Sequence, residues 1–279
     1  MSNNSSGTGG KSIAVQPRVL VVANQKGGVG KTTTTINLGT ALAAAGENVL
    51  IVDLDPQGNA STGLGIDRSD RLISTYDVLV EGASLHSAAI PTAVPRLSVA
   101  PSTMDLLGAE ADLGDDKKRT FRLREAVKAL GSSATDEGYT YLLVDCPPSL
   151  NLLTINAMTA ADSVLVPLQC EFFALEGLSQ LLQTVEMVKS NLNPTLSIHG
   201  IVLTMFDPRN NLSGQVADDV REHLGDKVYK TIIPRNVRVS EAPSHGKPAL
   251  LYDYHCSGSQ AYIRLASEVI QRERSLRAA

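Results

Sequence analysis

A glycine-rich segment, Gln25-Lys26-Gly27-Gly28-Val29-Gly30-Lys31-Thr32-Thr33, separates two stretches of different hydrophobic pattern. Residues 18–24 (RVLVVAN) before it form a short β-branched run that is typical of a buried strand. Residues 32–45 after it place apolar side chains at helical spacing and stop at Gly46. Residues 48–53 (NVLIVD) form a second buried run. Strand, turn, helix and strand make a βαβ unit, which predicts parallel strands with a right-handed crossover.

The same alternation of strand and helix patterns continues along the chain. Further strands are predicted at residues 97–100, 141–145, 163–167, 197–204 and 228–233. Helices are predicted at residues 150–160, 175–191, 213–224 and 258–272, with less regular helical pieces at 75–80, 104–113 and 117–130. We therefore expect a single α/β domain over residues 17–279, a doubly wound and mostly parallel sheet flanked by helices.

Two polar segments are expected to lie outside this domain core. Residues 1–16 are rich in Ser, Asn and Gly, which predicts a disordered tail. Residues 131–138 (GSSATDEG) are predicted to form a surface loop.

Composition excludes several classes of protein. The 279 residues are 43% hydrophobic but only 4% aromatic, so the core must be aliphatic. The net charge of −4 argues against a protein coated in basic charge for permanent DNA binding, and the three widely spaced cysteines argue against disulfides or zinc. No run approaches the ~18 apolar residues of a membrane span, and the first ten residues lack a signal peptide's apolar region. We expect a cytoplasmic protein.

The glycine-rich segment has the chemistry of a phosphate-binding loop. Its glycines allow backbone N–H groups to turn toward phosphate oxygens, and the following helix adds the partial positive charge of its N-terminus. Lys31 can reach the β- and γ-phosphates, and the Thr32 hydroxyl can ligate Mg²⁺. The alternative, a glycine-rich turn with a chance Gly-Lys-Thr, fits this context much less well.

Carboxylates follow two of the predicted strands, at the sheet edge where ligands bind in doubly wound folds. Asp53 and Asp55 lie at the end of one strand, where a carboxylate can hold a Mg²⁺-bound or attacking water, and we expect Asp53 to be structural or to lie behind the residues that contact the ligand. A plain turn over residues 55–58 is the alternative. Asp145 ends the run YLLVD and can lie beside the phosphate loop. The next residue, Cys146, is expected to be a small buried side chain.

The loop departs from the usual pattern because its first position is Gln25 and a second lysine, Lys26, follows. In this it resembles the deviant Walker A ATPases, a family of P-loop NTPases marked by x-K-G-G-x-G-K-[ST]. The resemblance implies that Lys26 reaches across a dimer interface, formed with Gly27 and Gly28, to the partner's nucleotide. It implies ATP and Mg²⁺ as ligands, with nucleotide bound by Lys26, Gly27, Gly28, Val29, Gly30, Lys31, Thr32 and Thr33. It also implies that Lys26, Lys31, Asp55 and Asp145 are catalytic and that Thr32, Asp55 and Asp145 face the metal.

Four longer runs are similar to the chromosomal ParA (Soj) branch of that family: residues 49–65, 142–157, 167–182 and 233–253. This resemblance implies an ATP-dependent sandwich dimer that binds double-stranded DNA without sequence preference and is released by hydrolysis. It further implies slow hydrolysis that a ParB-type partner stimulates, and a location on the nucleoid. The cargo, a chromosome or a plasmid, is left open.

Two arginines and a turn gain predicted roles from this resemblance. Arg209 and Arg238 match arginines that contact the DNA backbone, and the turn from Pro234 to Asn236 matches one near the adenine. The segment from Lys227 to Lys247 contains five basic residues and one acidic residue, which gives it a net charge of +4. Such a patch would bind phosphates without reading bases.

Two other branches of the family are less consistent with the sequence. A MinD-like membrane-associated positioning ATPase, the main alternative, needs a C-terminal amphipathic helix, but residues 270–279 are polar. An iron–sulfur ATPase would need a cysteine near Leu152, seven residues beyond Asp145. A structural DNA-binding protein with an inactive loop is disfavoured because all the predicted catalytic residues are present.

Overall fold

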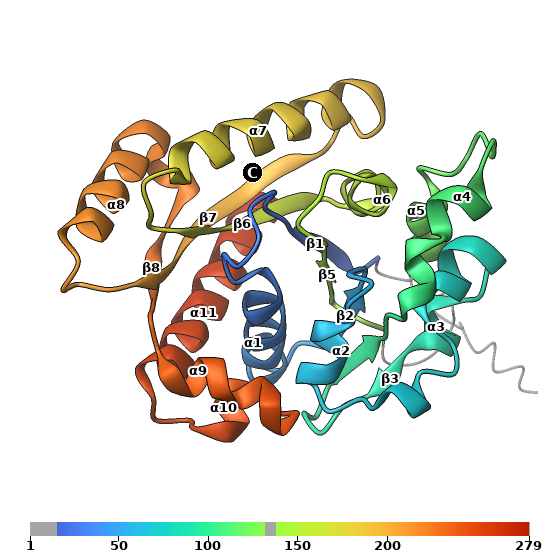
Figure 1. The fold of residues 1–279 in the computed structure, drawn as a ribbon, viewed down its shortest axis with the longest axis horizontal. Helices are drawn as coiled ribbons and strands as arrows, with labels where there is room; N and C mark the ends of the chain where they lie inside the picture. The colour runs from blue at the N-terminus through green and yellow to red at the C-terminus, as the bar shows by residue number, and fades with distance from the viewer. Residues whose placement is uncertain (1–15, 132–137, 279) are drawn as a thin grey trace, which may run out of the picture.

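The computed structural model describes residues 16–131 and 138–278. Its strands form a single eight-stranded sheet between two layers of helices (Figure 1). The strands are β1 (Arg18–Val22), β2 (Val49–Asp53), β3 (Ile90–Pro91), β4 (Leu97–Ala100), β5 (Tyr141–Asp145), β6 (Ser163–Gln169), β7 (Ser197–Phe206) and β8 (Val228–Pro234).

The sheet order is β3-β4-β2-β5-β1-β6-β7-β8, and every pairing is parallel except that of β3 with β4. The last residue of β5, Asp145, lies beside Val22 of β1 and Asp53 of β2. The three central strands therefore end level with one another. Because all of these strands are parallel, the loops that follow them meet at one edge of the sheet.

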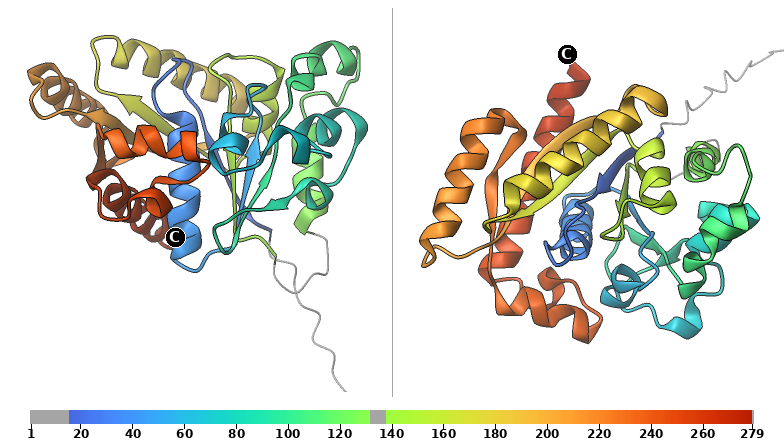
Figure 2. Two further views of the ribbon diagram at one scale, coloured as in Figure 1. Left: turned by 60° about the horizontal axis from the view of Figure 1, so that its bottom comes forward. Right: turned by 45° about the horizontal axis from the view of Figure 1, so that its top comes forward.

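The helices are α1 (Lys31–Ala44), α2 (Asn59–Gly63), α3 (Leu85–Ala88), α4 (Ala109–Leu113), α5 (Arg122–Gly131), α6 (Leu152–Ala160), α7 (Ala174–Asn191), α8 (Asn211–Leu224), α9 (Val237–Glu241), α10 (Ala249–Tyr252) and α11 (Ser257–Ala278). Helices α5, α6, α7 and α8 pack on one face of the sheet, and α1, α9, α10 and α11 pack on the other (Figure 2).

Alternating side chains of each strand supply the two cores. In β1, Val19 and Val21 face one layer of helices, while Leu20 and Val22 face the other. Burial on both faces explains why the strands are continuous apolar runs rather than alternating ones. The core is aliphatic, as expected, with Tyr229 and Tyr262 as its largest fully buried side chains.

Both edges of the sheet are modified. At one edge, β3 has only two residues, and the second is Pro91. At the other edge, the Glu268 carboxylate of α11 accepts hydrogen bonds from the backbone N–H groups of Lys230 (2.8 Å) and Thr231 (3.1 Å) in β8.

The predicted strands and long helices are confirmed with small shifts at their ends, and the region between β2 and β5 differs most. The antiparallel β3 was not predicted. The helix predicted over residues 104–113 is divided at Gly108 into a 3₁₀ turn and α4. The helix predicted from Lys117 begins only at Arg122, because Asp116 accepts from the Lys118 N–H and the Arg122 guanidinium in a turn.

One short predicted helix has a different form in the structure, and the two predicted polar segments lie mostly outside the described residues. The piece predicted over residues 75–80 is a π-helical turn at Asp77–Glu81. The predicted tail (1–16), apart from Gln16, and nearly all of the predicted loop (131–138) lie outside the described residues. In the described ranges, no helix has the length and apolar character needed to cross a membrane.

The central strands should dominate stability. Leu143 of β5 is fully buried, so Leu143→Ala should lower the free energy of unfolding by about 2–5 kcal/mol. Leu72→Ala removes a side chain that is 86% exposed and should change the free energy of unfolding by less than about 0.5 kcal/mol. Chemical denaturation followed by circular dichroism measures both, and equal losses would contradict the assignment of β5 to the core.

Candidate nucleotide site at the carboxyl edge of the sheet

The glycine-rich loop connects the end of β1 to the start of α1, as predicted. Gly28 and Gly30 have φ angles of +75° and +89°, a region that side-chain-bearing residues rarely adopt. A Cβ added at Gly27 or Gly28 would meet no atom within 4 Å, so backbone conformation rather than crowding requires glycine at position 28. Gly30 is the N-cap of α1, which places the positive end of that helix at the loop.

Lys31, the first residue of α1, carries its ammonium group back into the loop. The side chain is buried, and Nζ donates to the Lys26 carbonyl at 3.0 Å. Burial lowers the pKa of Lys31, and the nearby carboxylates of Asp145 and Asp55 partly oppose that change. A buried ammonium at the mouth of a loop of backbone N–H groups is suited to binding phosphate oxygens.

Thr32 and Asp145 are brought together across the sheet edge. The Thr32 hydroxyl donates to Asp145 Oδ2 at 2.7 Å, and the Thr35 hydroxyl donates to Oδ1 at 3.1 Å. Asp145 is fully buried, and burial together with repulsion from Asp53 raises its pKa. Cys146 beside it is buried as predicted, and burial raises the pKa of its thiol.

The Thr32–Asp145 pair fits a magnesium ion by the chemistry of its donors. Hydroxyl and carboxylate oxygens are the hard ligands that Mg²⁺ prefers. Nowhere in residues 16–131 and 138–278 do three or more His, Cys, Asp or Glu side chains form a group able to hold a metal. Mg²⁺ usually takes one or two protein ligands and completes its shell with water and substrate phosphates.

Asp53 and Asp55 have different surroundings. Asp53 is fully buried and accepts from the Ser61 N–H (2.9 Å) and hydroxyl (2.7 Å), while burial raises its pKa to about 6. These contacts join the end of β2 to α2. Asp55 is half-buried, and its Oδ1 accepts from the Gln57 N–H at 3.0 Å. The Asp55 carbonyl accepts from the Ser102 hydroxyl at 2.6 Å, which ties the loop to the chain beyond β4.

Lys26 makes an ion pair that the sequence reasoning missed. Its Nζ lies 2.7 Å from Oε2 of Glu171, which follows β6. Glu171 stands in a run that resembles the family, yet no role was predicted for it. The rule that identified Asp55 and Asp145, a carboxylate after a buried strand, also applies to Glu171 and could have identified it.

Arg209 lies in the loop after β7 and is 86% exposed. Its guanidinium makes two contacts with Asp207, at 2.9 Å to Oδ1 and 2.8 Å to Oδ2. The hydrogen bonds and charge of Arg209 lower the pKa of Asp207 to about 2. Arg209 is therefore solvent-accessible, but part of its charge is balanced by its neighbour.

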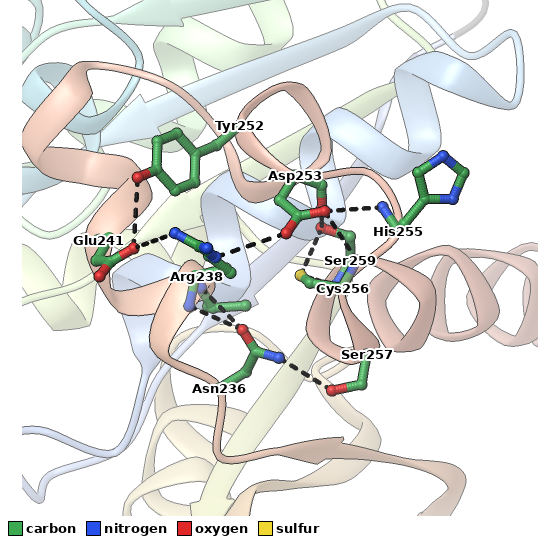
Figure 3. A network of polar contacts seen from close by, with 10 residues as sticks. Asn236, Arg238, Glu241, Tyr252, Asp253, His255, Cys256, Ser257 and Ser259 are labelled. Carbon is green, nitrogen blue, oxygen red and sulfur yellow. Dashed lines mark hydrogen bonds and ion pairs between the residues drawn. The ribbon is translucent and has the colours of Figure 1, made fainter.

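Arg238 lies in α9, beyond the end of β8, within a polar network (Figure 3). Its guanidinium contacts Glu241 at 3.1 Å and Asp253 at 3.7 Å. Asn236, predicted to lie near the adenine, caps α9 by accepting from the Arg238 N–H (2.9 Å) and donates to the Ser257 hydroxyl (3.0 Å). Its amide thus joins α9 to α11, and Pro234 is the last residue of β8.

The basic residues between Lys227 and Lys247 do not form one compact patch. Lys227 precedes β8 at the amino edge of the sheet, whereas Arg235 and Arg238 follow it at the carboxyl edge. A seven-residue strand separates them by roughly 20 Å. The expectation of a single +4 cluster is wrong, because counting charge along a strand joins residues from opposite edges of the sheet. The arginines at the carboxyl edge remain candidates for binding phosphates.

Comparison with known proteins identifies the family. The family described as "AAA domain" matches residues 17–198. A chromosome partitioning protein ParA of Caulobacter vibrioides is 64% identical over 261 residues, covering 94% of this chain and 97% of that protein. The sporulation initiation inhibitor protein Soj of Bacillus subtilis is 53% identical over 252 residues, covering 90% and 98%.

Solved structures agree with the fold. A cobyrinic acid a,c-diamide synthase from Mycobacterium smegmatis with bound ADP and magnesium has a TM-score of 0.80 at 36% identity, covering 93% of this chain and 96% of that one. The septum site-determining protein MinD from Pyrococcus horikoshii, complexed with Mg-ADP, has a TM-score of 0.73 at 30% identity, covering 91% and 96%. From its phosphate loop, its sheet and these relatives, the chain belongs to the ParA/Soj family of chromosome-partitioning ATPases.

Proposed function

We propose that this protein hydrolyses ATP with Mg²⁺ and uses the cycle to bind and release DNA during segregation. The observation that carries the proposal is the Thr32–Asp145 hydrogen bond of 2.7 Å beside the buried ammonium of Lys31. Relatives solved with ADP or an ATP analogue and magnesium support the choice of nucleotide and metal. The experiment that tests it is DNA co-sedimentation with ATP, with ADP and without nucleotide across a salt series.

In this mechanism the residues from Lys26 to Thr33 bind the phosphates. Backbone N–H groups of Gly27, Gly28, Val29 and Gly30 surround the phosphate oxygens, and Lys31 neutralises the β- and γ-phosphates. Thr32 and Asp145 would hold a magnesium ion, which would supply positive charge against the phosphate oxygens. The turn from Pro234 to Asn236 borders the base.

Asp55 orients the water that attacks the γ-phosphate. The Ser102 hydroxyl and the Gln57 N–H restrain its loop from two sides, so the carboxylate is held near the phosphate loop while it remains half-exposed to solvent. We infer that a ParB-type partner stimulates hydrolysis.

Two ATP-bound subunits then form a dimer through Lys26, Gly27 and Gly28, with Lys26 directed to the partner's nucleotide. Dimerisation brings two copies of Arg209 and Arg238 onto one particle that binds double-stranded DNA without sequence preference. Doubling the phosphate contacts raises DNA affinity steeply and makes it salt-dependent. The protein would then be nucleoid-associated in the cytoplasm while it holds ATP.

Removal of the loop lysine should abolish nucleotide binding. In Lys31→Ala a buried charge that pairs with phosphate is lost, so ATP affinity should fall at least about 30-fold. Fluorescent nucleotide titration measures the affinity, with the exposed Lys117→Ala as a control that should match the wild type. Undiminished ATP affinity in Lys31→Ala would refute the loop assignment.

Loss of Asp55 should separate binding from hydrolysis. Asp55→Ala should bind ATP, dimerise and stay on DNA, while its turnover falls about 100-fold or more because the water is no longer positioned. Steady-state phosphate release and size-exclusion with ATP measure the two properties. The exposed Asp67→Ala is the control. Normal hydrolysis by Asp55→Ala would exclude its proposed role.

Charge reversal at Arg238 should remove DNA binding but not dimerisation. Arg238→Glu should lose ATP-dependent co-sedimentation with DNA, and any residual binding should show a salt slope smaller by about two, one phosphate contact per subunit. Lys117→Glu makes the same charge change at an exposed position before α5, a helix that packs on the opposite face of the sheet from α9, and should bind as the wild type does. Equal DNA binding by both variants would remove Arg238 from the interface.

A further inference from the structure

The side chain on which the proposed dimer depends is held within its own subunit. The Lys26 ammonium lies 2.7 Å from Glu171 Oε2, and the two side chains are 37% and 47% exposed. In the proposed dimer the same ammonium must approach a phosphate of the partner's nucleotide. A carboxylate in one subunit and a phosphate in the other therefore compete for one cation.

The Glu171 carboxylate is fixed in the position that receives Lys26. Its second oxygen, Oε1, contacts the Gln169 side-chain amide at the end of β6. Its carbonyl accepts from the Ala174 N–H at 2.9 Å, where α7 begins. Glu171 is thus held at the junction of a central strand and a long helix, and its side chain is oriented toward the phosphate loop.

The backbone of Lys26 is fixed as well, independently of Glu171. Its N–H donates to Asn24 Oδ1 at 3.0 Å, and its carbonyl accepts from Lys31 Nζ at 3.0 Å. The Gln25 amide donates to the Thr184 hydroxyl of α7 at 2.9 Å. With the backbone anchored on both sides, the Lys26 side chain can change partners without a rearrangement of the loop.

We propose that Glu171 is a positioning residue that retains Lys26 in its own subunit, and that dimer closure exchanges this ion pair for one with the partner's nucleotide. The proposal rests on the proposed function, because it takes ATP-dependent pairing of two subunits as given. It adds a residue that opposes closure. The protein then stays monomeric until the phosphate charge of ATP outcompetes a carboxylate that is already in place.

The isosteric substitution Glu171→Gln removes the charge and keeps the shape. An ion pair between partly exposed side chains contributes up to about fivefold to an equilibrium constant. Two such ion pairs break when a dimer forms, one in each subunit, so Glu171→Gln should raise the dimerisation constant by up to about 25-fold. Glu171→Asp keeps the charge on a shorter side chain, so its dimerisation constant should lie between those of Glu171→Gln and the wild type.

The experiment is an ATP titration followed by light scattering on the full chain. The matched control is Glu176→Gln, which removes an exposed carboxylate from the first turn of α7. Dimers of Glu171→Gln should form at lower ATP concentration than those of the wild type, and the control should not differ from it. Fluorescent ADP binding to the monomer should be the same in all three proteins.

A double-mutant cycle on the monomer without nucleotide shows whether Glu171 acts through Lys26. Chemical denaturation of the wild type, Glu171→Gln, Lys26→Gln and the double variant should give a coupling of up to about fivefold in the unfolding equilibrium constant, as expected for a partly exposed ion pair. Additive effects of the two substitutions, or no effect of Glu171→Gln on ATP-dependent dimerisation, would overturn the proposal. A wild-type protein that remains monomeric with ATP would instead defeat the proposed function, and this proposal with it.

Discussion

The register of β5 with its two neighbours determines the geometry of the whole site. Asp145 ends β5 beside Val22 of β1 and Asp53 of β2, so the loops after these strands start at the same level. The phosphate loop, the Asp145 carboxylate and the Asp55 loop consequently lie close together. A shift by one residue would turn Asp145 to the opposite face of the sheet, away from Thr32.

Placing carboxylates at this level requires burying them, and burial needs compensation. Asp145 receives two hydroxyl hydrogen bonds from α1, and Asp53 receives an N–H and a hydroxyl from Ser61 of α2. Unpaired buried carboxylates would be costly, so threonine and serine in the first turns of these helices are part of the site. Two of the four threonines after Lys31, Thr32 and Thr35, therefore stabilise the buried Asp145 carboxylate within the protein itself.

Much of the fold could be predicted because its signals are local. Strands β1, β2 and β5 can be identified from short apolar runs, because they are buried on both faces of the sheet. The phosphate loop can be identified from its closely spaced glycines. The region from β2 to β5 was harder, because short turns such as the one at Asp116 depend on side-chain hydrogen bonds. Contacts between distant segments, such as Lys26 with Glu171, follow from topology and were not apparent. The prediction of a single basic cluster was wrong for the same reason, because residues near each other in the sequence lie at opposite ends of β8.

The structures of the two edge strands, β3 and β8, limit how copies of this chain can associate. At β3 the strand is too short, and its Pro91 offers no N–H for another strand. At β8 the Glu268 carboxylate of α11 already accepts hydrogen bonds from two backbone N–H groups, those of Lys230 and Thr231. Fibre-like growth by strand addition is disfavoured at both ends. The dimer proposed above uses neither edge strand, because it would form through the loops at the carboxyl edge of the sheet, where its contacts would depend on a bound nucleotide.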